Sequence, residues 1–271
     1  WATVDETSTE AEVNGVRFVD AETRPSVRTF FETYGDRACI FNGIEVRSIT
    51  HQRCQRLAFT GTTSTQADDF SSILAAHSSG SLLLPHTVIS GPAYTSKYTS
   101  QVVRVGQSQQ LPVLLEGSHP EYSDQLIEAQ NAGLESVVDA FVMDRAKQYA
   151  DLAGPGRAQR FGQSYDRVLE QLAEVGGLTD QLDFSSGDVQ SQARNAVNLL
   201  ELGVSRCATI QHNGLYDMGW DSHATIGLQD SHFELLFELL ISIMEELDGR
   251  TALSGNPLSD EVTVVVMSEM G

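Results

Sequence analysis

Short apolar runs alternate with helix-like patterns along most of the chain. Apolar positions at helical spacing predict helices at 50–61, 68–77, 157–176, 188–203 and 231–249. Continuous apolar runs predict buried strands at 37–46, 81–90, 100–106, 206–211 and 261–267. Strands that alternate with helices are typical of a largely parallel sheet with helices on its faces, so the pattern predicts an α/β fold.

Two of the predicted helices have residues that are typical of helix ends. Gly61 and Gly249 are expected to end the helices at 50–61 and 231–249. Ser231 and Glu234 form an S-x-x-E pattern, which predicts a capping box at the start of the last helix. The first 30 residues are polar and acidic, and we expect them to be loosely structured.

Between about 120 and 203 the pattern is helical throughout. One apolar stripe of a long amphipathic helix is predicted from Ile127, Leu134, Val137, Val138, Phe141 and Val142. We therefore expect residues 1–271 to form a single α/β domain with a helical block at about 120–203. Because the chain stops directly after an apolar strand pattern, the domain is expected to be incomplete at both ends.

The excess of acidic residues argues against nucleic acid and anionic membranes as binding partners. Acidic residues number 37 against 17 basic ones, which gives a formal net charge of −20. Such a surface repels nucleic acid and anionic membranes, because phosphate binding relies on clustered Lys and Arg. No apolar run is long enough to span a bilayer. The three cysteines are widely spaced and indicate neither a disulfide framework nor a zinc finger.

Ligands of parallel α/β sheets bind beyond the C-terminal ends of the strands. The loops that begin at Asn42, Gln211 and Ser268 are therefore where chemistry is expected. Together they offer Arg47, Ser48, Thr50, His51, His212, Asp217, Asp221, His223 and Glu269. Carboxylates and imidazoles that converge from several strand ends are what a divalent cation requires, whether zinc, calcium, magnesium or manganese.

Each of these groups also has a structural interpretation. An Asp-x-His pattern occurs often by chance in polar turns, and a strand-terminal Glu often caps a helix. Trp220 is expected to pack under its loop rather than bind a ligand. The remaining histidines are expected to have surface or helix-capping roles: His77, His86, His119 and His232.

Three segments resemble a bacterial family, the domain-of-unknown-function family 1501. "NLLELGVSRCATIQHNGLYDMGWDSH" is similar to its LLxxGV…GGWDTH segment, and "LSDEVTVVVMSEMG" to its strand ending in S-E-F-G. A weaker match is "GIEVRSITHQRCQRLAFTGT", which resembles its S-x-S-H…T-G segment. The matches occur in the family's order and cover about half of the chain. The family belongs to the alkaline-phosphatase-like superfamily, whose members have a three-layer α/β fold.

The resemblance assigns roles to particular residues. It implies that Asp221, His223 and Glu269 are metal ligands. The nucleophile of the superfamily is a Ser, Thr or modified Cys nine positions before the Thr of a Thr-Gly pair. Counting back from Thr60 gives His51, which is not a hydroxyl residue. His51 could be a metal ligand, a general acid or base, or a nucleophile. Thr50 and Ser48 are close enough to replace it if the register slips, and His212, Asp217 and Arg47 are further candidates for the site.

Two functions from different classes follow from these residues. The first is an exported, metal-dependent hydrolase or transferase of a phosphate or sulfate ester, whose substrate is a small anionic ester or a sulfated or phosphorylated glycan. The second is a non-enzymatic exported binding or assembly protein that retains the fold. The substituted nucleophile and Met270, where hydrolytic relatives often have a His, favour the second. Export, to the periplasm or outside the cell by a twin-arginine signal, is implied by the resemblance alone.

Overall fold

The computed structural model describes most of the chain in two compact units. The described residues are 8–41, 44, 46, 48–78, 82–105, 132–153, 156–176, 182, 187–217, 219–221 and 226–268. The first unit comprises residues 1–103 and 187–271, and the second comprises residues 104–186. The two units are described separately below.

A β-hairpin and a helix open the first unit. β1 (Thr9–Val13) pairs antiparallel with β2 (Val16–Asp20). The connecting Asn14 and Gly15 both have positive φ, 51° and 78°, as a two-residue hairpin turn of type I′ requires. α1 (Pro25–Tyr34) follows, and its Phe31 stacks on Phe18 of β2 with ring centroids 4.9 Å apart. The expectation of a loosely structured N-terminal segment was therefore wrong for residues 9–30, because a favourable turn and aromatic packing order them.

A three-stranded sheet lies at the centre of the first unit. Its strands, β3 (His86–Val88), β4 (Val102–Arg104) and β5 (Cys207–Thr209), are in the order β4-β3-β5. β3 and β5 are parallel, and all three residues of β3 are buried. These strands fall within three of the predicted runs, and the predicted mixed α/β class with a parallel strand pair is confirmed.

Two other predicted strands are absent from the described residues. Residues 38–41 form no ladder, and Phe41 is 79% exposed. Residues 262–268 likewise form none, and Val265 is 68% exposed. An apolar run becomes a strand only when a neighbouring strand accepts and donates its backbone hydrogen bonds. Neither run has such a neighbour among the described residues. The prediction of a buried strand was therefore wrong at 261–267 and at residues 37–41, while residues 42, 43 and 45 lie outside the described part of the chain.

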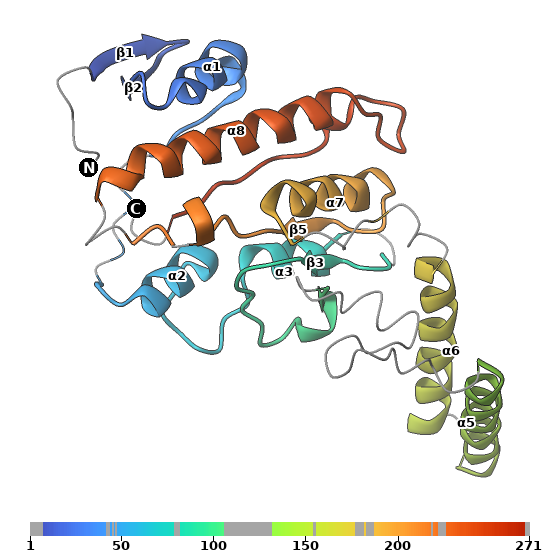
Figure 1. Cartoon of the computed structure of the whole chain (residues 1–271). Helices are drawn as coiled ribbons and strands as arrows, with labels where there is room; N and C mark the ends of the chain where they lie inside the picture. Colours follow the sequence, from blue (N-terminus) through green and yellow to red (C-terminus); the bar gives the residue numbers. More distant parts are fainter. Residues whose placement is uncertain are drawn as a thin grey trace, which may run out of the picture. The chain divides into compact units, whose positions relative to one another are not determined.

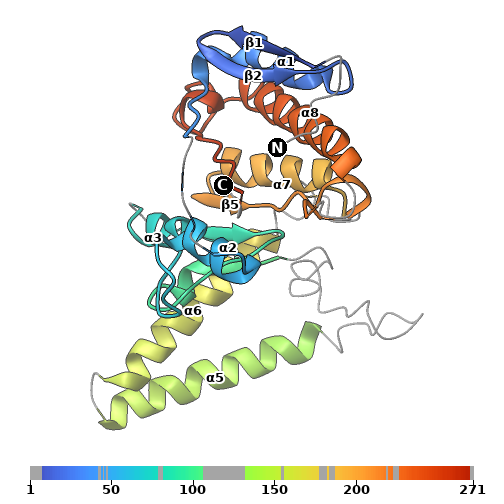
Figure 2. The ribbon, with the colours of Figure 1, turned by 90° about the vertical axis from the view of Figure 1, so that its left-hand side faces the viewer.

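The first unit contains five α-helices among the described residues, and two of them, α1 and α7, pack against α8. α2 (His51–Thr60) and α3 (Phe70–Ala76) precede β3, while α7 (Val189–Glu201) and α8 (Gln229–Asp248) flank β5 in sequence. Short 3₁₀ turns lie at Gly35–Arg37, Thr99–Gln101, Leu215–Asp217, Ile226–Leu228 and Leu258–Asp260. α8 lies between α1 on one side and α7 on the other (Figure 1 and Figure 2). α7, which the sequence groups with the preceding helices, therefore packs in this unit.

An apolar cluster joins α7, α8 and the segment after α8. Its buried members are Val197, Leu247, Ala252 and Leu258, with Ile243, Met244 and Val262 packed against them. Burial of a Val or Leu side chain contributes about 1.5–3 kcal/mol. This cluster thus holds the C-terminal segment against the two helices.

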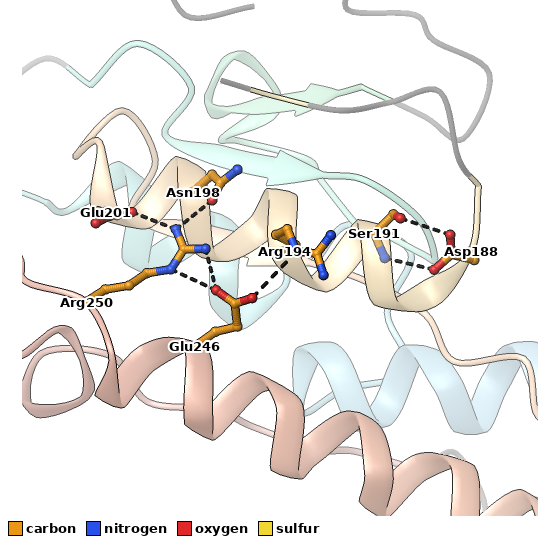
Figure 3. Close-up of polar contacts among 7 residues, drawn as sticks. All are labelled: Asp188, Ser191, Arg194, Asn198, Glu201, Glu246 and Arg250. Carbon is orange, nitrogen blue, oxygen red and sulfur yellow. Dashed lines mark hydrogen bonds and ion pairs between the residues drawn. The ribbon is translucent and has the colours of Figure 1, made fainter. Parts of the chain in front are cut away.

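A polar network reinforces the same junction (Figure 3). The Arg250 guanidinium donates to Asn198 Oδ1 and Glu201 Oε2 of α7, both at 2.6 Å, and to the Glu246 carboxylate of α8. The hydrogen bond from Arg250 lowers the pKa of the Glu246 carboxyl below its ordinary range. At the other end of α7, Asp188 accepts from the Ser191 amide and caps the helix.

The predicted capping box of α8 does not form. α8 begins at Gln229, so Ser231 lies inside the helix, and Leu228 at the N-cap position makes no side-chain capping bond. Glu234 instead accepts from the Ser26 amide at 2.9 Å and from the Ser26 hydroxyl at 2.7 Å. Ser26 is in the first turn of α1, where the backbone amides have no partner within the helix. Glu234 therefore caps a different helix from the one predicted.

The second unit contains a pair of helices. α5 (Ala132–Ala153) and α6 (Arg157–Gly176) pack against each other, with Ala146 buried. The Tyr165 hydroxyl donates to Asp139 Oδ1 at 2.6 Å across the pair. Of the predicted apolar stripe, Val137, Val138 and Phe141 are each more than half exposed. The helix was predicted correctly, but these three positions do not form its buried face.

A helix that spans a bilayer needs about 20 predominantly apolar residues in succession. Within the described ranges, no helix is both long enough and apolar enough to do so.

Candidate functional site

The N-terminus of α2 forms one side of the candidate site. Thr50 has extended backbone angles, and its carbonyl accepts from the amides of Arg53 and Cys54, both at 3.0 Å. The Thr50 amide donates to Ser48 Oγ at 3.2 Å, and the Cys54 thiol donates to the Ser48 carbonyl at 3.1 Å. These bonds fix residues 48–50 against the helix, so His51 becomes its first residue.

The other side is the loop that follows β5. At its start the Gln211 amide donates to Ser90 Oγ at 2.7 Å, just beyond the end of β3. Within the loop, the Gly219 amide donates to the Asn213 carbonyl at 2.7 Å. The loop therefore begins at the C-terminal edge of the sheet, where ligands of parallel sheets bind.

His51 and Asp221 meet where the start of α2 and this loop approach each other. His51 Nε2 lies 3.2 Å from Asp221 Oδ2, and each side chain is 45% exposed. The two residues are far apart in the sequence and come from two different predicted strand-end loops. The sequence predicted both as site residues, and the structure places them in contact within reach of solvent.

Trp220 and His212 hold the loop together from inside. The Trp220 indole N–H donates to the His212 carbonyl at 3.0 Å and lies 3.3 Å from His212 Nδ1. The Gly214 amide donates to the same Nδ1 at 3.1 Å. Trp220 packs under the loop as predicted. The described contacts of His212 Nδ1 are structural, so this nitrogen orders the loop rather than facing a ligand.

His232 is a second internal support, which the sequence did not reveal. It was predicted to have a surface role, but it is 1% exposed. Its Nδ1 accepts from the Leu215 amide at 2.7 Å, and its ring lies 5.3 Å from that of Trp220. Burial lowers the pKa of His232 below its ordinary value of 6.5. A histidine near the start of a helix gives no local signal of burial, because a loop from elsewhere in the chain covers it.

His86 was also predicted to lie at the surface, and that prediction was wrong. It is 1% exposed in β3, with Nε2 2.8 Å from Thr209 Oγ1 and Nδ1 3.2 Å from Ser72 Oγ. This network ties α3 and β5 to β3. His77, in contrast, caps the C-terminus of α3 as predicted, with Nδ1 2.8 Å from the Ile73 carbonyl.

The start of α2 beside His51 attracts anions, although the protein as a whole is strongly acidic. The N-terminus of α2 carries partial positive charge, which attracts anions. Arg56, one turn further on, lies over the Tyr94 ring with its guanidinium carbon 4.4 Å from the centroid.

Cys207 is a poor nucleophile, because burial raises the pKa of its thiol to about 11.

The remaining predicted residues lie outside the described part of the chain. They are His223, Glu269, Arg47 and the side chain of Asp217. Among the described residues, no three His, Cys, Asp or Glu side chains gather where they could hold a metal ion. The structure thus describes one pair of the predicted constellation, His51 with Asp221.

Comparisons with known proteins assign neither a family nor a function to this chain. No family model, no curated protein and no solved structure matched this chain.

Proposed function

We propose that this chain is a metal-dependent hydrolase or transferase of a phosphate or sulfate ester, with an alkaline-phosphatase-like three-layer fold. One observation carries the proposal: His51 Nε2 at the start of α2 and Asp221 Oδ2 in the loop after β5 lie 3.2 Å apart. The sequence resemblance gives both residues a place in the active site. Their contact supports that pairing, since nothing in their separation along the chain requires it.

The two side chains suit a divalent cation. Imidazole nitrogen and carboxylate oxygen are both ligands of zinc, and the carboxylate also suits calcium, magnesium and manganese. Two ligands of one tetrahedral ion, with bonds of about 2.0–2.1 Å, are about 3.3 Å apart. His51 and Asp221 would hold such an ion, together with His223 and Glu269 as the resemblance implies. A bound metal would polarise the ester oxygens and stabilise the charge that develops on them.

The chain's own groups would bind and orient the anionic ester. The positive end of α2 attracts the phosphate or sulfate toward His51 and offsets the protein's net charge of −20. His51, at the position of the superfamily's nucleophile, is then placed to transfer a proton or to attack the ester.

Metal binding and ester hydrolysis test this proposal directly. The purified chain would be stripped of metal and titrated calorimetrically with Zn²⁺, Mn²⁺, Mg²⁺ and Ca²⁺. Each form would then be assayed on p-nitrophenyl phosphate, bis-p-nitrophenyl phosphate and p-nitrophenyl sulfate. We expect one metal to support hydrolysis, and H51A and D221N each to lower kcat/KM by at least about 100-fold. H77A is the matched control, since His77 is another exposed histidine at a helix end.

A second function is favoured by a different observation. Phe41 and Val265 are 79% and 68% exposed, and large exposed apolar side chains are typical of binding surfaces. A non-enzymatic binding or assembly protein would use such surfaces. Absence of metal binding together with unchanged behaviour of H51A would reject the hydrolase in favour of this alternative.

A further inference from the structure

Two backbone amides of the loop that carries Asp221 donate hydrogen bonds to other parts of the first unit. Near its start, Gln211 donates its amide to Ser90 beyond β3. Further along, the Leu215 amide donates to His232 Nδ1 of α8 at 2.7 Å. Of these two attachments, only the second can change with protonation, because a hydroxyl oxygen does not titrate near neutral pH.

The hydrogen bond determines the state of the imidazole. Since Nδ1 accepts a hydrogen bond from the Leu215 amide, the ring is neutral and carries its own hydrogen on Nε2. A protonated ring would present a second N–H to the Leu215 N–H across the same 2.7 Å, so the bond would be lost.

The surroundings leave the ring no room to turn away. A Cβ on Gly214 would lie 2.5 Å from His232 Nδ1, so the loop backbone passes directly over the ring. The Trp220 ring covers it at a centroid distance of 5.3 Å. Only glycine fits position 214, where φ is also +75°.

Among the described residues, charged or titratable groups approach His232 from the segment before α1, from α8 and from the loop. From the segment before α1, buried Arg24 lies over the Phe233 ring, with its guanidinium carbon 5.6 Å from the centroid. Asp230, in the first turn of α8, lies 3.6 Å from Arg24 and offsets its charge. From the loop, His212 approaches through the shared contact with Trp220. None of these groups supplies an unpaired carboxylate that would stabilise a buried imidazolium, and burial itself disfavours the charge.

We propose that His232 is a positioning residue that holds the Asp221 loop in place while its imidazole is neutral, and that protonation releases the loop. Asp221 then leaves His51, so the candidate site is assembled at neutral pH and dismantled in acid. The inference rests on the proposed function only in treating the contact of His51 with Asp221 as the site.

The test compares two variants at one position. H232N keeps a hydrogen-bond acceptor at the δ position but does not titrate, whereas H232L fills the space without an acceptor. Two readouts need neither metal nor substrate. The first is Trp220 fluorescence in a W1F background, which a nearby imidazolium quenches. The second is the NMR resonance of the His51 ring, which D221N is expected to shift.

At pH 7.5 we expect H232N to match the parent in both readouts. We expect H232L to give the His51 ring resonance of D221N. As the pH falls below 6.5, the Trp220 fluorescence of the parent should change, while that of H232N should stay constant. Circular dichroism reports whether each variant is folded, and the pH comparison of the parent with H232N decides the question even if H232L does not fold.

Two results would overturn the inference. One is an acid-induced change in H232N equal to that of the parent, which would assign the titration to His212. The other is a folded H232L whose His51 resonance is that of the parent. Because neither readout involves hydrolysis, failure of the proposed function would leave this test intact.

Discussion

At the scale of single residues, the candidate site depends on residues that are not themselves candidates for ligand binding or catalysis. Gly214 is the best example, because both its backbone angle and its neighbour exclude a side chain. His77 and Trp220 have the local roles predicted for them, because each contacts residues close by in the sequence. His51 and Asp221, two of the predicted site residues, lie next to each other. Burial of His232 was not predictable, since it depends on packing between distant segments.

Replacement of Gly214 by Ala is expected to destabilise the first unit and to displace the loop. A positive φ in a non-glycine residue costs on the order of 1–3 kcal/mol, and the new Cβ would also clash with His232. The free energy of unfolding from urea titration measures the loss. G187A is the control, because a Cβ there meets nothing within 4 Å and φ is not in the left-handed region. It should leave stability unchanged or raise it by about 0.4–1 kcal/mol. Equal stability of the two variants would contradict the packing described for Gly214.

At the scale of elements, helices were predicted more reliably than strands. The helices near 50–61, 68–77, 157–176, 188–203 and 231–249 are all present. A helix satisfies its own backbone hydrogen bonds, so its amphipathic pattern is a local property. A strand needs a neighbour, which is why the equally apolar runs at 37–46 and 261–267 form none among the described residues.

The capping role of Glu234 leads to a prediction at this scale. E234A should lower the free energy of unfolding by about 1 kcal/mol, because two hydrogen bonds at the start of α1 are lost. S231A is the matched control and should change stability by less than about 0.5 kcal/mol. Both would be measured by urea unfolding followed by circular dichroism. The sequence-based capping box makes the opposite prediction, that the two variants are equally destabilising, so the pair decides between the two arrangements.

At the scale of the whole molecule, the excess of acidic residues is a source of self-repulsion. With a net charge of −20, repulsion acts over the whole surface, whereas each exposed ion pair contributes only about 0–1 kcal/mol. Even Arg28, which bonds to Asp20, is 41% exposed. Repulsion is therefore expected to outweigh these attractive pairs.

Added salt should consequently stabilise the protein. Raising NaCl from about 0.01 M to about 0.3 M shortens the Debye length from about 30 Å to below 8 Å and screens the repulsion. We expect the thermal unfolding temperature at pH 7.5 to rise by a few degrees. Sodium sulfate would stabilise by a different effect, so chloride is the appropriate salt. A fall in the unfolding temperature would show that ion pairs dominate instead.

The sequence by itself determined the α/β class, the positions of most helices and the set of candidate residues from which His51 and Asp221 come. These follow from local periodicity and from the rule that chemistry gathers at strand ends. Only the tertiary structure decided which strands have partners, that Glu234 caps α1, and that His232 is buried beneath the Asp221 loop. Each of these depends on contacts between segments far apart in the chain, and a pattern read along the sequence does not contain that information.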